Sequence, residues 1–131
     1  MAAWHASAGA TLLMPSGHEG KHLFVVLNNP ATFQGYGPRP HIVLVNVSTV
    51  RPGIPHDTTC LLAAGCHPFV NQESFVAYRY TRIEPVAHVE EMVRQGVFEP
   101  KDPVTEGLLT AISAGLRKSP FTKREFKQLT L

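Results

Sequence analysis

Short runs of apolar and β-branched residues, separated by Gly and Pro, fill the first two thirds of the chain. The strongest is residues 41–51, HIVLVNVSTVR, which has Pro-containing turns on both sides. Because side chains alternate along a strand, one face is wholly apolar: Val43, Val45 and Val47. The opposite face becomes polar at Asn46 and Ser48. We therefore expect a central strand whose C-terminal end leaves the core and lies near a site.

Four further runs predict four further strands. They are residues 10–14, 21–28, 58–63 and 74–83. A turn through His18 and Glu19 joins the first two, so these predict an antiparallel hairpin. Five strands with no helix between them are typical of a small antiparallel sheet that curls into a barrel.

After residue 85 the apolar residues recur every three to four positions, which is the spacing of one face of a helix. The first expected helix ends at Gly96 and has an apolar stripe of Val86, Val89 and Val93. The segment FEPKDP breaks it. Asp102 as N-cap and Pro103 at the first helical position predict a second helix. Its apolar stripe is Val104, Leu108, Leu109, Ile112 and Leu116.

Thr122 and Glu125 have the spacing of a capping box, which predicts a last short helix over residues 121–129. The order is therefore strands first and helices last. We expect one domain, 1–131, made of a barrel over residues 10–83 and a C-terminal helical appendage over 86–129. The fold class is mainly β, or α+β by count.

Composition supports a globular chain rather than a disordered one. Of its 131 residues, 44% are hydrophobic and 17% charged, enough to build one sizeable core. A net charge of +2 is too small to indicate nucleic acid by itself. Two cysteines, Cys60 and Cys66, favour free thiols and a cytoplasmic location. No apolar run approaches the ~20 residues that span a bilayer, and no signal peptide is recognisable, so we expect no membrane association.

Two groups of polar residues could handle a phosphate. Hydroxyls and a cation follow the end of the central strand, at Ser48, Thr49 and Arg51. His22 could serve as a general acid or base, and Lys21 beside it could stabilise a developing negative charge. The alternatives are a capped strand end with Arg51 in solvent and an exposed basic pair at a turn.

Aromatic and basic residues could bind bases. Tyr78, Arg79, Tyr80 and Arg82 interleave along the fifth strand, as in surfaces that stack on bases and hold phosphates. An ordinary half-exposed strand has the same pattern. In the loop 29–40, Phe33 and Tyr36 could cover a cleft or pin the loop to the body.

Cysteine and histidine also gather in the middle of the chain. His56, Cys60, Cys66 and His67 are ligand types for zinc. Their spacing is not that of a standard zinc motif, so we expect no metal and no other cofactor. Cys60 is expected in the core. His67 is expected in a turn, where it could still face a cleft.

Four of these segments together resemble the PemK/MazF-like family of bacterial toxins. They are ATLLM, KHLFVVLN, VLVNVSTVR and SFVAYRYTRI, within residues 10–83. Ser48 and Thr49 fall on the family's hydroxyl pair, and His22 on its catalytic Arg position. His22-Leu23 replaces the family's Arg-Pro, and Asn46 stands where the family has Pro. The resemblance implies an SH3-like barrel, a homodimer, metal-independent cleavage of single-stranded RNA, and an antitoxin-like partner that occludes the RNA groove.

Two function hypotheses follow. One is a metal-independent endoribonuclease in which His22 acts as the base. The other is a non-catalytic SH3-like module that binds a peptide, RNA or partner protein through residues 33–36 and 74–82. A small-ligand or metal site around His56, Cys60 and His67 is a third interpretation.

Overall fold

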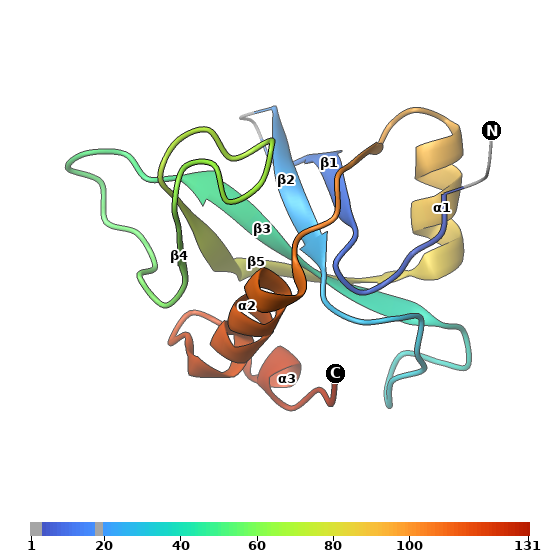
Figure 1. Ribbon diagram of the computed structural model, residues 1–131. Coiled ribbons are helices and arrows are strands. Elements are labelled where there is room, and N and C mark those ends of the chain that lie inside the picture. The colour runs from blue at the N-terminus through green and yellow to red at the C-terminus, as the bar shows by residue number, and fades with distance from the viewer. Residues whose placement is uncertain (1–3, 18–19) are drawn as a thin grey trace.

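The computed structural model of the chain describes residues 4–17 and 20–131 (Figure 1). The turn predicted at His18 and Glu19 lies outside the described residues. Six strands form one antiparallel sheet in the order β4-β5-β3-β2-β1-β6. They are β1 (Thr11–Pro15), β2 (Lys21–Val26), β3 (His41–Thr49), β4 (Leu61–Leu62), β5 (Ser74–Pro85) and β6 (Glu99–Lys101). The helices are α1 (Val86–Arg94), α2 (Glu106–Lys118) and α3 (Arg124–Lys127). The sheet is strongly curled, so the fold is a barrel-like α+β fold.

The central strand β3 is buried on both faces, because helices of the same chain cover each side of the sheet. One face, here called the α2 core, packs on α2: Leu23, Val25, Val43, Val45, Val47, Val76, Tyr78, Ile112 and Leu116. The other, the α1 core, packs on α1: Leu12, Met14, Phe24, Val26, Ile42, Leu44, Val89 and Phe98. The predicted apolar face of β3 is therefore confirmed. The expectation that the C-terminal end of β3 leaves the core is also confirmed, since Ser48 is half-buried and Thr49 exposed; the polar side chain of Asn46 before them is still buried, at 1% exposed.

The sheet has a sixth strand that the sequence pattern did not predict. Residues Glu99–Lys101, expected to do no more than break a helix, pair with the free edge of β1, with Glu99 opposite Leu13. Pro100 is tolerated there because an edge strand needs fewer backbone donors. The strand predicted over 58–63 shrinks to Leu61–Leu62. The prediction of five strands is therefore wrong, whereas the hairpin of β1 and β2 is confirmed.

The end of α1 and the start of α2 compare differently with the sequence prediction. Gly96, with φ of 75°, ends α1 in a Schellman arrangement: its N–H donates to Val93 and that of Val97 to Met92. The predicted start of α2 is wrong. Thr105, not Asp102, caps the helix by accepting from the Leu108 N–H at 3.2 Å.

Residues 102–104 stay extended because other parts of the chain use their backbone. The Asp102 carbonyl accepts from the Thr11 hydroxyl at 2.7 Å, and the Val104 N–H donates to the Gly9 carbonyl at 2.9 Å. A helix beginning at Pro103 would break both bonds.

The last helix is shorter than expected and lacks the predicted capping box. It runs from Arg124 to Lys127, and its N-cap residue Lys123 makes no side-chain cap. The Thr122 hydroxyl is buried without a hydrogen-bond partner among residues 4–17 and 20–131. Over the same residues, no helix combines the length and apolar character needed to cross a bilayer.

Tyr78 fastens α2 to the sheet. Its ring is fully buried, and its hydroxyl donates to the Ile112 carbonyl at 2.6 Å. Burial raises the pKa of this phenol far above its ordinary value. The ring lies against Gly115, where a methyl group would overlap its hydroxyl. Tyr78 therefore belongs to the α2 core, and the expectation that it stacks on a base is wrong.

We predict that Gly115→Ala lowers the free energy of unfolding by about 1–3 kcal/mol or more, because the buried Tyr78 ring has no space to move into. Gly107→Ala in the same helix is the matched control. Nothing lies near its added methyl group, so it should stabilise the protein by about 0.5–1 kcal/mol. Urea denaturation of both variants measures the difference. Equal effects would contradict the close contact.

Candidate functional site

The start of β2, the end of β3 and the start of β5 lie side by side at one end of the sheet. In the antiparallel register, Leu23 near the start of β2 lies opposite Val47 near the end of β3. Ser48 at the end of β3 lies opposite Phe75 at the start of β5. This places the Lys21-His22 pair beside the polar end of the central strand, as the sequence predicted.

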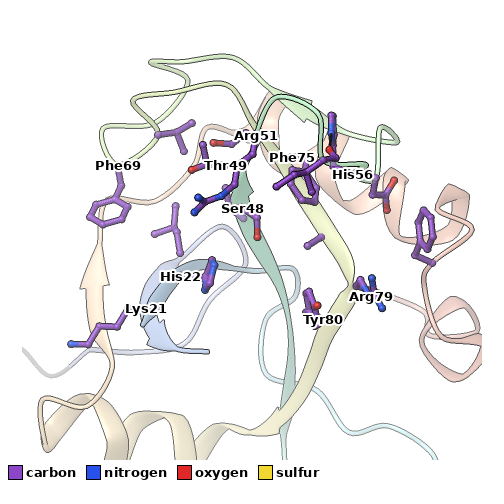
Figure 2. Close-up of a pocket in the computed structure, with 18 of the residues that line it drawn as sticks. Lys21, His22, Ser48, Thr49, Arg51, His56, Phe69, Phe75, Arg79 and Tyr80 are labelled. Atoms are coloured by element: carbon purple, nitrogen blue, oxygen red, sulfur yellow. Dashed lines mark hydrogen bonds between the residues drawn. The ribbon is translucent and has the colours of Figure 1, made fainter. Parts of the chain in front are cut away.

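A cleft of about 630 Å³ opens at this end of the sheet. Six of the predicted site residues line it: Lys21, His22, Ser48, Thr49, Arg51 and Arg79. Figure 2 shows His22 and Ser48 in the middle of the cleft, with Thr49 and Arg51 above them in this view. The two phosphate-handling groups proposed from the sequence therefore share one site.

Much of the remaining lining is aromatic or apolar, and of it the sequence had singled out only Tyr80 and His56 as candidates for binding. It includes Ile54, His56, Phe69, Phe75, Tyr80 and Phe121. Phe75 could have been found, because it shares the alternation phase of Arg79 along β5. His56 carried a signal only as part of the small-ligand or metal group with Cys60 and His67, and Phe121 carried none. Phe121 lies 41 or more positions along the sequence from every other residue that lines the cleft, so only the fold brings it there.

The cleft carries unbalanced positive charge. In the described part of the chain, the guanidinium groups of Arg51 and Arg79 form no hydrogen bond or ion pair with a carboxylate. Lys21 is different, because its ammonium lies 2.6 Å from Glu99 of β6. That contact lowers the pKa of Glu99, through the hydrogen bond and the positive charge. An anion entering the cleft would therefore meet two free cations, Arg51 and Arg79.

The carboxylate in the lining, Asp57, is already engaged. It is buried, and its Oδ2 accepts from the Ser119 hydroxyl at 2.5 Å while its Oδ1 accepts from the Thr59 N–H at 2.9 Å. The Ser119 hydroxyl oxygen also accepts from the Phe121 N–H at 3.1 Å. We call this set of bonds the Asp57–Ser119 clamp. It ties the loop after β3 to the end of α2 and offsets the cost of burying a charge.

A neighbouring side chain fixes the hydrogen bonding of Ser48, whereas that of His22 is not fixed within the described residues. The Ser48 hydroxyl donates to Oδ1 of buried Asn46 at 2.6 Å, so its oxygen faces the cleft as an acceptor. The Nδ1 atom of His22 is buried and has no hydrogen-bond partner within the described residues. No described group therefore fixes which ring nitrogen of His22 carries the proton.

An irregularity in β5 directs two side chains toward the cleft. Between Leu44 and Asn46, one residue of β3 faces four residues of β5, from Tyr78 to Thr81. The Thr81 hydroxyl donates to the Tyr78 carbonyl at 2.6 Å and closes the bulge. Strict alternation ends here, so the consecutive residues Arg79 and Tyr80 are both exposed.

Five predicted site residues lie outside the cleft lining: Tyr78, described above, and four others that each have a structural role. Phe33 is buried in the α2 core and pins its loop, so the pinning alternative is confirmed. Tyr36 packs on the same core and donates to Glu125 at 3.4 Å. Arg82 lies over the Phe24 ring, 5.1 Å from its centroid. These three side chains contact other parts of the protein instead of the ligand that the sequence had predicted for them.

His67 is the fourth. It is buried, its Nδ1 accepts from the Phe69 N–H at 3.0 Å, and its Nε2 donates to the Asp102 carbonyl. Both ring nitrogens are therefore used to hold the turn. His67 does not line the cleft beside His22 and borders a separate, smaller hollow together with Phe69 and Lys101.

The histidine and cysteine group does not converge. His56 lines the cleft beside the Phe75 ring, whereas Cys60 and Cys66 pack against the α2 core. Among the residues described, no three His, Cys, Asp or Glu side chains are grouped to hold one metal ion. Both thiols are free, and burial raises the pKa of each.

Comparison with family models, with curated proteins and with solved structures gave no match to this chain.

We predict that Ser119→Ala lowers the free energy of unfolding by about 1–3 kcal/mol, because it leaves Oδ2 of the buried Asp57 carboxylate without a donor and only Oδ1 still accepts, from Thr59. Ser113→Ala on the same helix makes a suitable control and should stay within about 0.5 kcal/mol of the wild type. Chemical denaturation reports both values. A Ser119→Ala protein as stable as the control would mean that the clamp does not hold the loop.

The raised thiol pKa values of Cys60 and Cys66 predict slow alkylation at pH 8. Iodoacetamide should label the folded protein more slowly than the urea-unfolded chain, with single Cys→Ala variants resolving each thiol. The same shift makes stability fall as pH rises above about 8.5, because the unfolded thiols lose their protons first. Equal labelling rates in both states would refute the shift.

Proposed function

We propose that this protein is a PemK/MazF-like, metal-independent endoribonuclease that binds single-stranded RNA in the cleft, on an SH3-like barrel. One observation carries the proposal: His22, Ser48 and Thr49, chosen from the sequence, line a single cleft together with the free cations Arg51 and Arg79. Aromatic rings at its edge add the stacking surface that single strands use. The curled antiparallel sheet is compatible with the barrel.

The chemistry assigns His22 the role of general base. Its unprotonated ring nitrogen takes the proton of a ribose 2′-hydroxyl, and the 2′-oxygen attacks the adjacent phosphorus. Arg51 stabilises the charge of the pentacoordinate phosphate, and Thr49 donates to a phosphate oxygen. Ser48 positions the phosphate once its proton turns away from Asn46. The bond from phosphorus to the 5′-oxygen breaks, and this oxygen takes a proton from water. The products are a 2′,3′-cyclic phosphate and a free 5′-hydroxyl.

A second candidate is binding without cleavage. Two contacts favour it: the Lys21 ammonium is held by Glu99, and the Ser48 proton is held by Asn46. Both groups would have to leave these partners before acting on a phosphate. In this case the same cleft serves an SH3-like module that holds RNA or a protein partner.

Two partners accompany the proposal. An antitoxin-like protein would cover the cleft, and a second copy of the chain would form a homodimer. The apolar stripe of α2 packs on the sheet of its own chain, so the dimer surface would lie elsewhere. The cytoplasmic location is the setting in which such a partner would meet this chain.

We expect the purified protein to cut single-stranded RNA of mixed sequence in the presence of EDTA and to leave DNA of the same sequence intact. His22→Ala should reduce the cleavage rate at least about a hundredfold, because the general base is removed. His88→Ala is the control, since His88 is an exposed histidine of α1 that does not line the cleft. Gel electrophoresis gives the rates, and mass spectrometry identifies the cyclic phosphate ends.

The outcomes separate the two candidates. RNA that is bound but not cut, by wild type and His22→Ala alike, would leave only the binding module. Cleavage of the DNA, or equal loss of activity in both histidine variants, would refute the role given to the 2′-hydroxyl or to His22.

A further inference from the structure

Exposed apolar side chains gather at the cleft rather than scatter over the surface. In residues 4–17 and 20–131, seven large hydrophobic residues are exposed: Ile54, Leu61, Phe69, Tyr80, Val97, Phe121 and Leu131. Four of the seven line the cleft, and three of these four are aromatic. Tyr80 is 54% and Phe121 52% exposed, so neither ring is needed to fill a core. Such a concentration of exposed rings marks a surface that binds something.

The position of one of these rings, Phe121, depends on hydrogen bonds between distant parts of the chain. Phe121 follows α2 and reaches the cleft because the Asp57–Ser119 clamp fastens the end of that helix to the loop after β3. The clamp joins two residues that are 62 positions apart, and it is buried. The same loop carries His56, whose ring lies 5.1 Å from that of Phe75. One wall of the cleft is therefore built by the C-terminal part of the chain.

The bulge of β5 adds two further side chains to the same side of the cleft. The guanidinium of Arg79 lies over the Tyr80 ring, 5.3 Å from its centroid, so ring and charge are presented together. Figure 2 shows Arg79 and Tyr80 on the same side of the cleft as Phe75 and His56 in this view, away from Lys21 and Phe69. Aromatic faces and a free cation thus occupy one end of the cleft, beyond His22 and Ser48.

We propose that this end of the cleft is a nucleobase subsite, in which Tyr80 and Phe121 stack on an unpaired base of the RNA and Arg79 holds its phosphate. This rests on the proposed binding of single-stranded RNA. A base suits the subsite better than an acidic peptide does, because the exposed groups here are mainly ring faces and only one is a cation. Ring stacking accepts any base, so the subsite supplies affinity with little sequence preference.

The test uses an RNA analogue that cannot be cut by attack of its own 2′-oxygen: a fluorescent 2′-O-methyl oligonucleotide of about eight residues. A series of such probes carries one abasic position each, moved along the strand. Fluorescence anisotropy measures the affinity of every probe for the wild type, Tyr80→Ala, Phe121→Ala and Leu131→Ala. Leu131 is the matched control, because it is 43% exposed and does not line the cleft.

We expect wild type to lose about tenfold in affinity when one particular base is missing. Tyr80→Ala and Phe121→Ala should each weaken the intact probe by about tenfold, and should show little further loss at that same abasic position. Leu131→Ala should bind as wild type does. Because the substituted rings are exposed, thermal melting should stay close to wild type and exclude misfolding as the cause.

Two results would overturn the subsite: unchanged affinity in both ring variants, or an abasic penalty that stays as large in the variants as in wild type. If RNA is cut normally and the ring variants bind normally, only the subsite is wrong. If the probes bind with the predicted pattern but RNA is never cut, the subsite stands and the endoribonuclease is wrong. If no probe binds the wild type, both are wrong.

Discussion

The central strand β3 is covered on both faces, and the rest of the molecule follows from this constraint. Its alternating side chains supply the middle of two separate cores, one closed by α1 and the other by α2. Neither helix reaches the last residues of the strand, so Ser48 and Thr49 come to the surface where β2 and β5 begin. The cleft is the place where the two cores end, which is why strand termini from three parts of the chain line it.

The elements that the sequence predicted well are those with strong local periodicity. The strands β1, β2, β3 and β5 and the helices α1 and α2 all carry apolar alternation or an apolar stripe, and all are present. The errors occur where a distant contact decides the conformation. Residues 99–101 become a strand only because β1 has a free edge, and residues 102–104 stay extended because Thr11 and Gly9 use their backbone. No local pattern records either partner.

The same distinction holds for the site. His22, Ser48, Thr49 and Arg51 were found because each stands at the end of a recognisable strand. Tyr78 continues the alternation of Val76 into the α2 core, whereas strict alternation does not anticipate the bulge, which exposes both Arg79 and Tyr80 after it. Phe121 could not be found, since its position depends on a buried carboxylate that belongs to another loop. A site built from strand ends can be predicted from sequence to the extent that its strands can.

The clamp between Asp57 and Ser119 also sets an order of events during synthesis. A nascent chain that has not yet emerged past α2 already contains all six strands, and local pairing such as that of β1 with β2 can form at once. The part of the cleft wall that Phe121 contributes cannot form yet, because residues 119–121 are still inside the ribosome. The growing chain therefore exposes His22, Arg51, Arg79 and Tyr80 before Phe121 is in place, and the cleft is complete only once residues 119–121 have emerged.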